Sequence, residues 1–203
     1  MKQEFKYAEL ILEIINSEKF KYNLEKLNSF YANLKQQGLI RNLILEELND
    51  YFESLDFKSL KAFAEHPRIK GTRIDLSIVD AENIEKPFKI EFKYQFSKDC
   101  NNLKDYWKII NKDFEVRVSD LFILIISDWD IDEKKIFDKK WGINSNLSRY
   151  VSKKIEWKTN IVQSFHRFEN TKFNECEKIT IHKPNKTDYY FYILERYKTA
   201  YNN

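Results

Sequence analysis

RIDLSIVDAENIEKPFKIEFKYQF, residues 73–96, is the stretch that decides the fold. Its first part, Arg73–Asp80, alternates between apolar and polar side chains, and so does its last part, Phe88–Phe96. Alternation with a period of two is typical of β-strands that bury one face. The polar connection 81–87 separates the two parts. The stretch therefore predicts two neighbouring antiparallel strands.

The flanking segments place this strand pair in a larger α/β domain. Apolar residues recur every three or four positions in three earlier segments, which predicts helices at 9–15, 24–34 and 39–55. Residues 59–67 predict a short strand and residues 101–114 a helix. The continuous apolar run in 120–127 is typical of a strand that is covered on both faces. The order helix, three strands, helix, strand indicates a parallel crossover before the last strand.

The polar faces of the two alternating strands carry the residues that could perform chemistry. Asp75 on the first strand and Glu91, Lys93 and Gln95 on the second are expected on one side of the sheet. Because Mg²⁺ keeps several of its waters, Asp75 and Glu91 with the backbone carbonyl of Phe92 are sufficient as ligands, and Mn²⁺ could substitute. Lys93 would stabilise the charge of a phosphoryl centre or hold the attacking water. Gln95 could hydrogen-bond a phosphate, a base edge or the lysine.

An acid on one strand and an acid-x-lysine on the next resemble the motif of the PD-(D/E)xK nuclease superfamily. The matching residues are Asp75 in RIDLSIVD and Glu91-Phe92-Lys93 in KIEFKYQ, although Ile74 precedes the first acid where the motif has proline. The resemblance implies a restriction-endonuclease-like αβββαβ core with a mixed central sheet. It also implies a metal-dependent nuclease in which Asp75, Glu91 and Lys93 are catalytic.

Many members of this superfamily carry a further acid on the helix before the core strands, and two glutamates compete for that role here. Glu46 points away from the apolar face of the predicted helix 39–55, whereas Glu47 lies on the flank of that face. Glu47 is therefore the residue that we expect to lean toward the metal.

Length and pattern together predict a single α/β domain. Residues 1–37 form N-terminal helices, residues 38–128 the nuclease-like core, and residues 129–203 an α+β extension with a terminal β-hairpin around residues 184–186. The extension matches no part of the superfamily pattern.

The resemblance implies a Mg²⁺-dependent endonuclease of a restriction or defence, mobile-element or toxin system. Nucleic acid is the expected partner, with DNA favoured over RNA, and a homodimer would let two sites cut two strands. The alternative is a catalytically inactive protein of the same fold that acts as a DNA-binding or immunity module. A third interpretation is an amphipathic sheet whose charged face is simply solvated.

Composition is compatible with each of these interpretations. The formal net charge is +3, from 35 basic and 32 acidic residues, which permits nucleic-acid binding without requiring it. No run approaches the roughly eighteen apolar residues of a membrane span, and the N-terminus lacks the pattern of a secretory signal, so a cytoplasmic protein without membrane partners is expected. Cys100 and Cys176 stand apart, which favours two free thiols over a disulfide.

Overall fold

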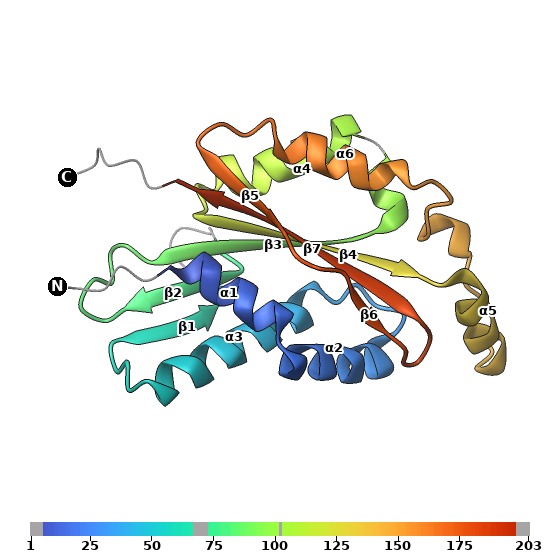
Figure 1. The fold of residues 1–203 in the computed structure, drawn as a ribbon, viewed down its shortest axis with the longest axis horizontal. Coiled ribbons are helices and arrows are strands. Elements are labelled where there is room, and N and C mark those ends of the chain that lie inside the picture. The colour runs from blue at the N-terminus through green and yellow to red at the C-terminus, as the bar shows by residue number, and fades with distance from the viewer. Residues whose placement is uncertain (1–5, 67–72, 102, 198–203) are drawn as a thin grey trace.

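The computed structural model describes residues 6–66, 73–101 and 103–197, with the backbone alone for 103–105. This part of the chain is a mixed α/β fold with six α-helices and a seven-stranded, mostly antiparallel open sheet (Figure 1). The α-helices are α1 (Tyr7–Asn16), α2 (Glu18–Tyr31), α3 (Gln37–Ser54), α4 (Leu103–Asn111), α5 (Ile131–Lys140) and α6 (Glu156–Phe165). The strands are β1 (Leu60–Ala64), β2 (Leu76–Asp80), β3 (Phe88–Phe96), β4 (Leu121–Trp129), β5 (Thr171–Glu175), β6 (Ile179–Ile181) and β7 (Thr187–Arg196).

The strands follow one another across the sheet in the order β1-β2-β3-β4-β7-β5, and β6 also pairs with β7. β3 and β4 are parallel and are connected through α4, whereas the other neighbouring pairs are antiparallel. The predicted order of helix, three strands, helix and strand is confirmed from α3 to β4, as is the parallel crossover.

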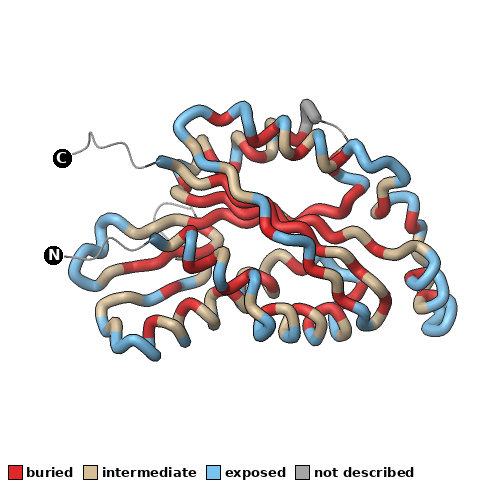
Figure 2. The backbone as a smooth tube through the Cα atoms, in the orientation of Figure 1, coloured by how far each residue is buried: buried red, intermediate tan, exposed pale blue. Residues whose placement is uncertain are grey.

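Two hydrophobic cores lie on opposite faces of the sheet, and β4 contributes to both. Ile123 and Ile125 belong to the core under α1, α2 and α3, while Phe122 and Leu124 belong to the core under α4 and α6. The whole run from Leu121 to Ile126 is buried, as expected for a strand covered on both faces. Figure 2 shows the buried backbone concentrated along these central strands.

The alternation predicted for β3 is confirmed. Its apolar positions pack into the core under α1, α2 and α3, and they include Ile90, Phe92, Tyr94 and Phe96. Side chains of alternate residues on a strand point to opposite faces, so the polar residues of β3 point to the face on which α4 and α6 pack. The parallel register supports this, since Glu91 is level with Phe122 and Lys93 with Leu124 of the second core.

All three predicted N-terminal helices are present, although α2 begins at Glu18, six residues before its predicted start. Ser17 caps α2, because its hydroxyl oxygen accepts a hydrogen bond from the Phe20 amide at 3.1 Å. The buried side chains of α3 occur at the predicted spacing of three and four residues and pack it onto the sheet: Ile40, Ile44, Leu48 and Phe52.

The C-terminal segment enters the sheet rather than extending from it. β7 pairs with β4 from Thr187 to Glu195, and β6 and β7 form the predicted hairpin around residues 182–186. The second edge of β4 needs a partner because an open buried edge leaves backbone groups without hydrogen bonds, and the apolar run of β7 provides it. Strand β5 was not predicted, since TKFNE carries a single large apolar side chain.

A buried polar network ties this hairpin to the N-terminal helices. The Tyr189 hydroxyl lies 2.6 Å from Gln36 Oε1 and 2.9 Å from Asn28 Oδ1, to which it can donate. The Gln36 amide nitrogen also donates to Asn28 Oδ1, and the Asn28 amide nitrogen donates to the Lys183 carbonyl. The network therefore joins segments more than 150 positions apart in the sequence.

Cys100 and Cys176 are buried free thiols, in agreement with the prediction. Among the described helices, none combines the length and the apolar character that crossing a bilayer requires.

Candidate functional site

The candidate site lies where β2 separates from β3. In the described chain the register between these strands ends at the pair Leu76–Ile90, while β3 continues beside β4 as far as Phe96. One step beyond the last pair, the antiparallel register sets Asp75 opposite Glu91. Both acids therefore reach the same fork between two diverging strands.

Asp75 is held at this fork by hydrogen bonds to its carboxylate. Its Oδ2 atom accepts from the backbone amide of Phe92 at 2.9 Å and from Nε2 of Gln37 at 3.3 Å. Gln37 in turn accepts from the Tyr94 amide at 3.1 Å through Oε1. The two side chains replace the backbone partners that β2 no longer supplies to the edge of β3.

Glu91 is a buried carboxyl group beside a second carboxyl group. Its exposed fraction is 1%, and its Oε2 atom accepts a hydrogen bond from Nη1 of Arg117 at 2.8 Å. Its Oε1 atom is buried and has no hydrogen-bond partner among the described residues. Burial and the neighbouring charge of Asp75 raise the pKa of Glu91 to about 8, although the guanidinium of Arg117 opposes them.

Lys93 lies two residues beyond Glu91 on the same face of β3, about 6.6 Å further along the strand. Its side chain is one-third exposed, and its Nζ atom lies 3.6 Å from Oδ2 of Asp113. Asp113 belongs to a π-helical turn, Lys112–Val116, that follows α4. Such turns are rare and are frequent at functional sites.

Gln95 and Phe92 complete the predicted set on β3. Gln95 is buried on the face of Glu91 and Lys93, level with Ile126. The ring of Phe92 packs in the core on the other side of the sheet. Since the amide of Phe92 points to the edge that β2 leaves open, its carbonyl points to the same edge.

The structure does not bring Glu47 to this group. Nζ of Lys19 on α2 pairs with Glu47 Oε2 at 2.9 Å. Along α3 Glu47 is ten residues from Gln37, which corresponds to roughly 15 Å at 1.5 Å per residue. The residue of α3 that does reach Asp75 is therefore the uncharged Gln37, at the start of the helix.

Arg117 and Asp113 were missed by the sequence analysis, yet the predicted crossover contained a signal for them. In the parallel register Ile90 is level with Leu121, so the residues that immediately precede β4 in the chain lie beside the start of β3. Charged residues just before the apolar run are therefore candidates to meet Glu91. Gln37 carries no comparable signal, because a glutamine at the start of a helix is unremarkable in sequence.

The residues at the fork fit a divalent cation that prefers oxygen ligands. The fit rests on two adjacent carboxyl groups that repel each other when ionised, one of which, Glu91, is buried. Within the described residues no three His, Cys, Asp or Glu side chains gather at one point. Two carboxylates, Asp75 and Glu91, with the Phe92 carbonyl and waters would therefore hold the ion, a ligand set that suits Mg²⁺.

The resemblance to the PD-(D/E)xK superfamily stays a prediction. The described chain has a mixed α/β fold and an open sheet in which one pair of central strands, β3 and β4, is parallel. A scan against protein-family models, a search of curated proteins and a search of solved structures returned no match for this chain.

Proposed function

We propose that this chain is a metal-dependent nuclease that hydrolyses phosphodiester bonds at the fork between β2 and β3, with the arrangement of a restriction-endonuclease-like core. The observation that carries the proposal is the pair Asp75 and Glu91. A buried carboxyl group held beside a second acid is costly for a folded chain unless it serves a purpose. A bound divalent cation would relieve that cost.

Each residue at the fork has a role in this proposal. A bound Mg²⁺ would supply polarisation of the phosphate and a more acidic water. Asp75 and Glu91 would hold the ion, since their carboxyl groups are close enough for the charge of Asp75 to raise the pKa of Glu91. Lys93 would place its ammonium group beside the phosphate, because it lies on the same face of β3 as Glu91 and its side chain is one-third exposed. Arg117 would hold Glu91 in place by its hydrogen bond to Oε2 until the ion arrives.

DNA is the substrate that we favour, and a system of restriction, defence, mobile elements or toxins is the proposed setting. We also propose that the chain forms a homodimer, because two copies of the site could then cut the two strands of a DNA duplex. The net charge of +3 allows a nucleic-acid partner.

The test is cleavage of plasmid DNA, single-stranded DNA and RNA by the purified protein in Mg²⁺, in Mn²⁺ and in EDTA. We expect metal-dependent cleavage that falls by a factor on the order of 10² or more in Asp75→Asn and in Lys93→Gln. Glu47→Gln is the matched control, since it removes an acid of α3 outside the fork. Full activity of Asp75→Asn and Lys93→Gln would refute the assignment.

A second candidate is a binding or neutralising protein that keeps this fold without catalysis. The observation in its favour is that both cations at the fork are already paired, Arg117 with Glu91 and Lys93 with Asp113. Such a protein would gain no thermal stability from Mg²⁺ or Mn²⁺, whereas a ligand that binds only the folded state raises the melting temperature. A metal-induced shift that is lost in Asp75→Asn would exclude this candidate.

A further inference from the structure

The sheet face that carries Glu91 and Lys93 continues across β2 and β1, where it forms a hollow. Lys89 lies two residues before Glu91, and the register aligns it with Ser77 and then with Phe63. The core under α4 and α6 includes described residues of β4 and β7 but none of β1, β2 or β3. Within the described residues, the core under α4 and α6 therefore does not extend over this part of the face.

The hollow has a volume of about 650 Å³, within the roughly 300–1,000 Å³ of sites that hold organic ligands. The strands β1, β2 and β3 form one side, and the connection between β2 and β3 forms another. The lining residues on which the inference rests are Lys58, Lys61, Phe63, His66, Ile84 and Lys89.

The lining combines a stacking platform with positive charge. The rings of Phe63 and His66 are stacked, with centroids 5.3 Å apart and planes 28° apart, and Phe63 is 39% exposed. Lys61 and Lys89 stand on β1 and β3, two strand spacings apart across the sheet and two residues apart along it, which corresponds to roughly 12 Å. The lining contains Glu85 against three lysines, Lys58, Lys61 and Lys89, so its net charge is positive.

An exposed aromatic pair between lysines matches the chemistry of a single nucleic-acid strand. Every base has a π-face that can stack on such a ring, and phosphates pair with the ammonium groups. A base inside a duplex is already stacked on both faces and cannot use the platform.

We propose that this hollow binds an unpaired stretch of the nucleic-acid substrate, an inference that rests on the proposed function. A base would stack on the Phe63–His66 pair, and phosphates would lie at Lys61 and Lys89. Lys89 and Glu91 are about 6.6 Å apart along β3. The Lys89 end of the hollow therefore lies close to the fork, and the hollow selects substrates that are single-stranded or locally unpaired there.

The experiment measures binding rather than cleavage. A single-stranded DNA of about 12 nucleotides, a length within the site size of single-strand binding folds, carries one 2-aminopurine and is titrated with the protein in EDTA. We expect quenching of the 2-aminopurine fluorescence on binding. Phe63→Leu should restore the fluorescence and weaken binding about tenfold, the effect of losing one stacked base. Lys61→Gln with Lys89→Gln should lower the slope of log K against log salt by about 1.4.

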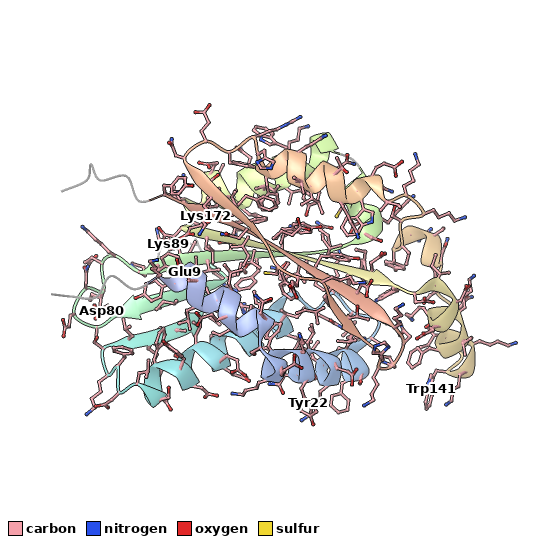
Figure 3. The ribbon with its side chains drawn as sticks, viewed as in Figure 1. Glu9, Tyr22, Asp80, Lys89, Trp141 and Lys172 are labelled. Atoms are coloured by element: carbon pink, nitrogen blue, oxygen red, sulfur yellow. The ribbon has the colours of Figure 1, made fainter. Side chains whose placement is uncertain are left out.

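Two matched variants serve as controls. Phe30→Leu alters a phenylalanine of α2 that is 71% exposed, and Lys172→Gln alters an exposed lysine of β5. Figure 3 labels Lys89 near the start of β3 and Lys172 on β5. The sheet order sets these two strands three spacings apart. Both controls should bind as the wild type does.

Normal binding by Phe63→Leu and by the double lysine variant would overturn the inference, as would equal affinity for a blunt duplex of the same sequence. The outcomes also separate the two proposals. Binding through the hollow without any metal-dependent cleavage would sustain the inference and refute the nuclease. Metal-dependent cleavage by the wild type, together with normal binding by the Phe63 and lysine variants, would sustain the nuclease and refute the inference about the hollow.

Discussion

Replacing Glu91 by glutamine should change how the stability of the protein depends on pH. The folded state raises the pKa of Glu91 from 4.5 to about 8, so it holds the proton more tightly than the unfolded chain does. A raised carboxyl pKa contributes stability that is complete below about pH 4.5 and is lost as the pH rises through about 8. Glutamine has nearly the same shape and does not titrate, so this contribution disappears in Glu91→Gln.

The expected effect is large because each pH unit between the two pKa values corresponds to about 1.36 kcal/mol. Between pH 5 and pH 9 the wild type should lose about 4 kcal/mol through Glu91, relative to the variant. That is a substantial fraction of the 5–15 kcal/mol that holds a typical domain together. With an m-value of about 2 kcal/mol per molar urea, the difference between the two midpoints should change by about 2 M.

The assay is urea unfolding followed by tryptophan fluorescence, from pH 5 to pH 9 in EDTA. Glu47→Gln is the matched control and should keep the pH trend of the wild type, since Glu47 lies outside the fork. Mg²⁺ should weaken the trend of the wild type, because an ion at Glu91 favours the ionised carboxylate. Parallel pH trends for the wild type and Glu91→Gln in EDTA would refute the reasoning.

Two further predictions concern the partners of Glu91 and the polar network. Arg117→Gln removes the cation that pairs with Glu91, so the free energy of unfolding of the metal-free protein should fall by about 1.5–3 kcal/mol in urea. Mg²⁺ should then raise the melting temperature of this variant by more than that of the wild type. Equal Mg²⁺ shifts for the two proteins would contradict this prediction. Tyr189→Phe leaves Asn28 and Gln36 without a buried hydroxyl partner, so urea unfolding should show a loss of about 1–3 kcal/mol with an unchanged Mg²⁺ shift. A variant as stable as the wild type would show that the network is not needed.

The sequence predicted the geometry of the fork because that geometry depends on local alternation. Asp75, Glu91 and Lys93 share a face as soon as the strand pair 73–96 is recognised, since successive side chains point to opposite faces. The antiparallel register between Leu76 and Ile90 then aligns the two acids. No information from distant parts of the chain is needed for this step.

The partners of these residues could not be predicted in the same way. Gln37 reaches Asp75 from a helix 38 positions earlier, and Arg117 reaches Glu91 across 26 positions. Such contacts depend on how helices and crossovers pack, which no local period encodes. Glu47 was chosen from its place on a helical face, but that face does not show which end of the helix approaches the sheet.

The C-terminal strands show the same limit on a larger scale. The hairpin of β6 and β7 was predicted from its turn and its apolar residues, yet its insertion beside β4 depends on the open edge of a strand some 60 positions earlier. Strand β5 was not predicted because an edge strand with few apolar residues resembles a loop in sequence.

The position of β7 has a consequence for how the protein is made. A ribosome that has translated as far as residue 180 carries a nascent chain with β3 and β4 complete but with one flank of β4 unpaired. An apolar strand with an open edge can pair with another chain and aggregate. The chain should therefore depend on chaperones, or on rapid completion of synthesis, until residues 187–196 emerge and close the sheet.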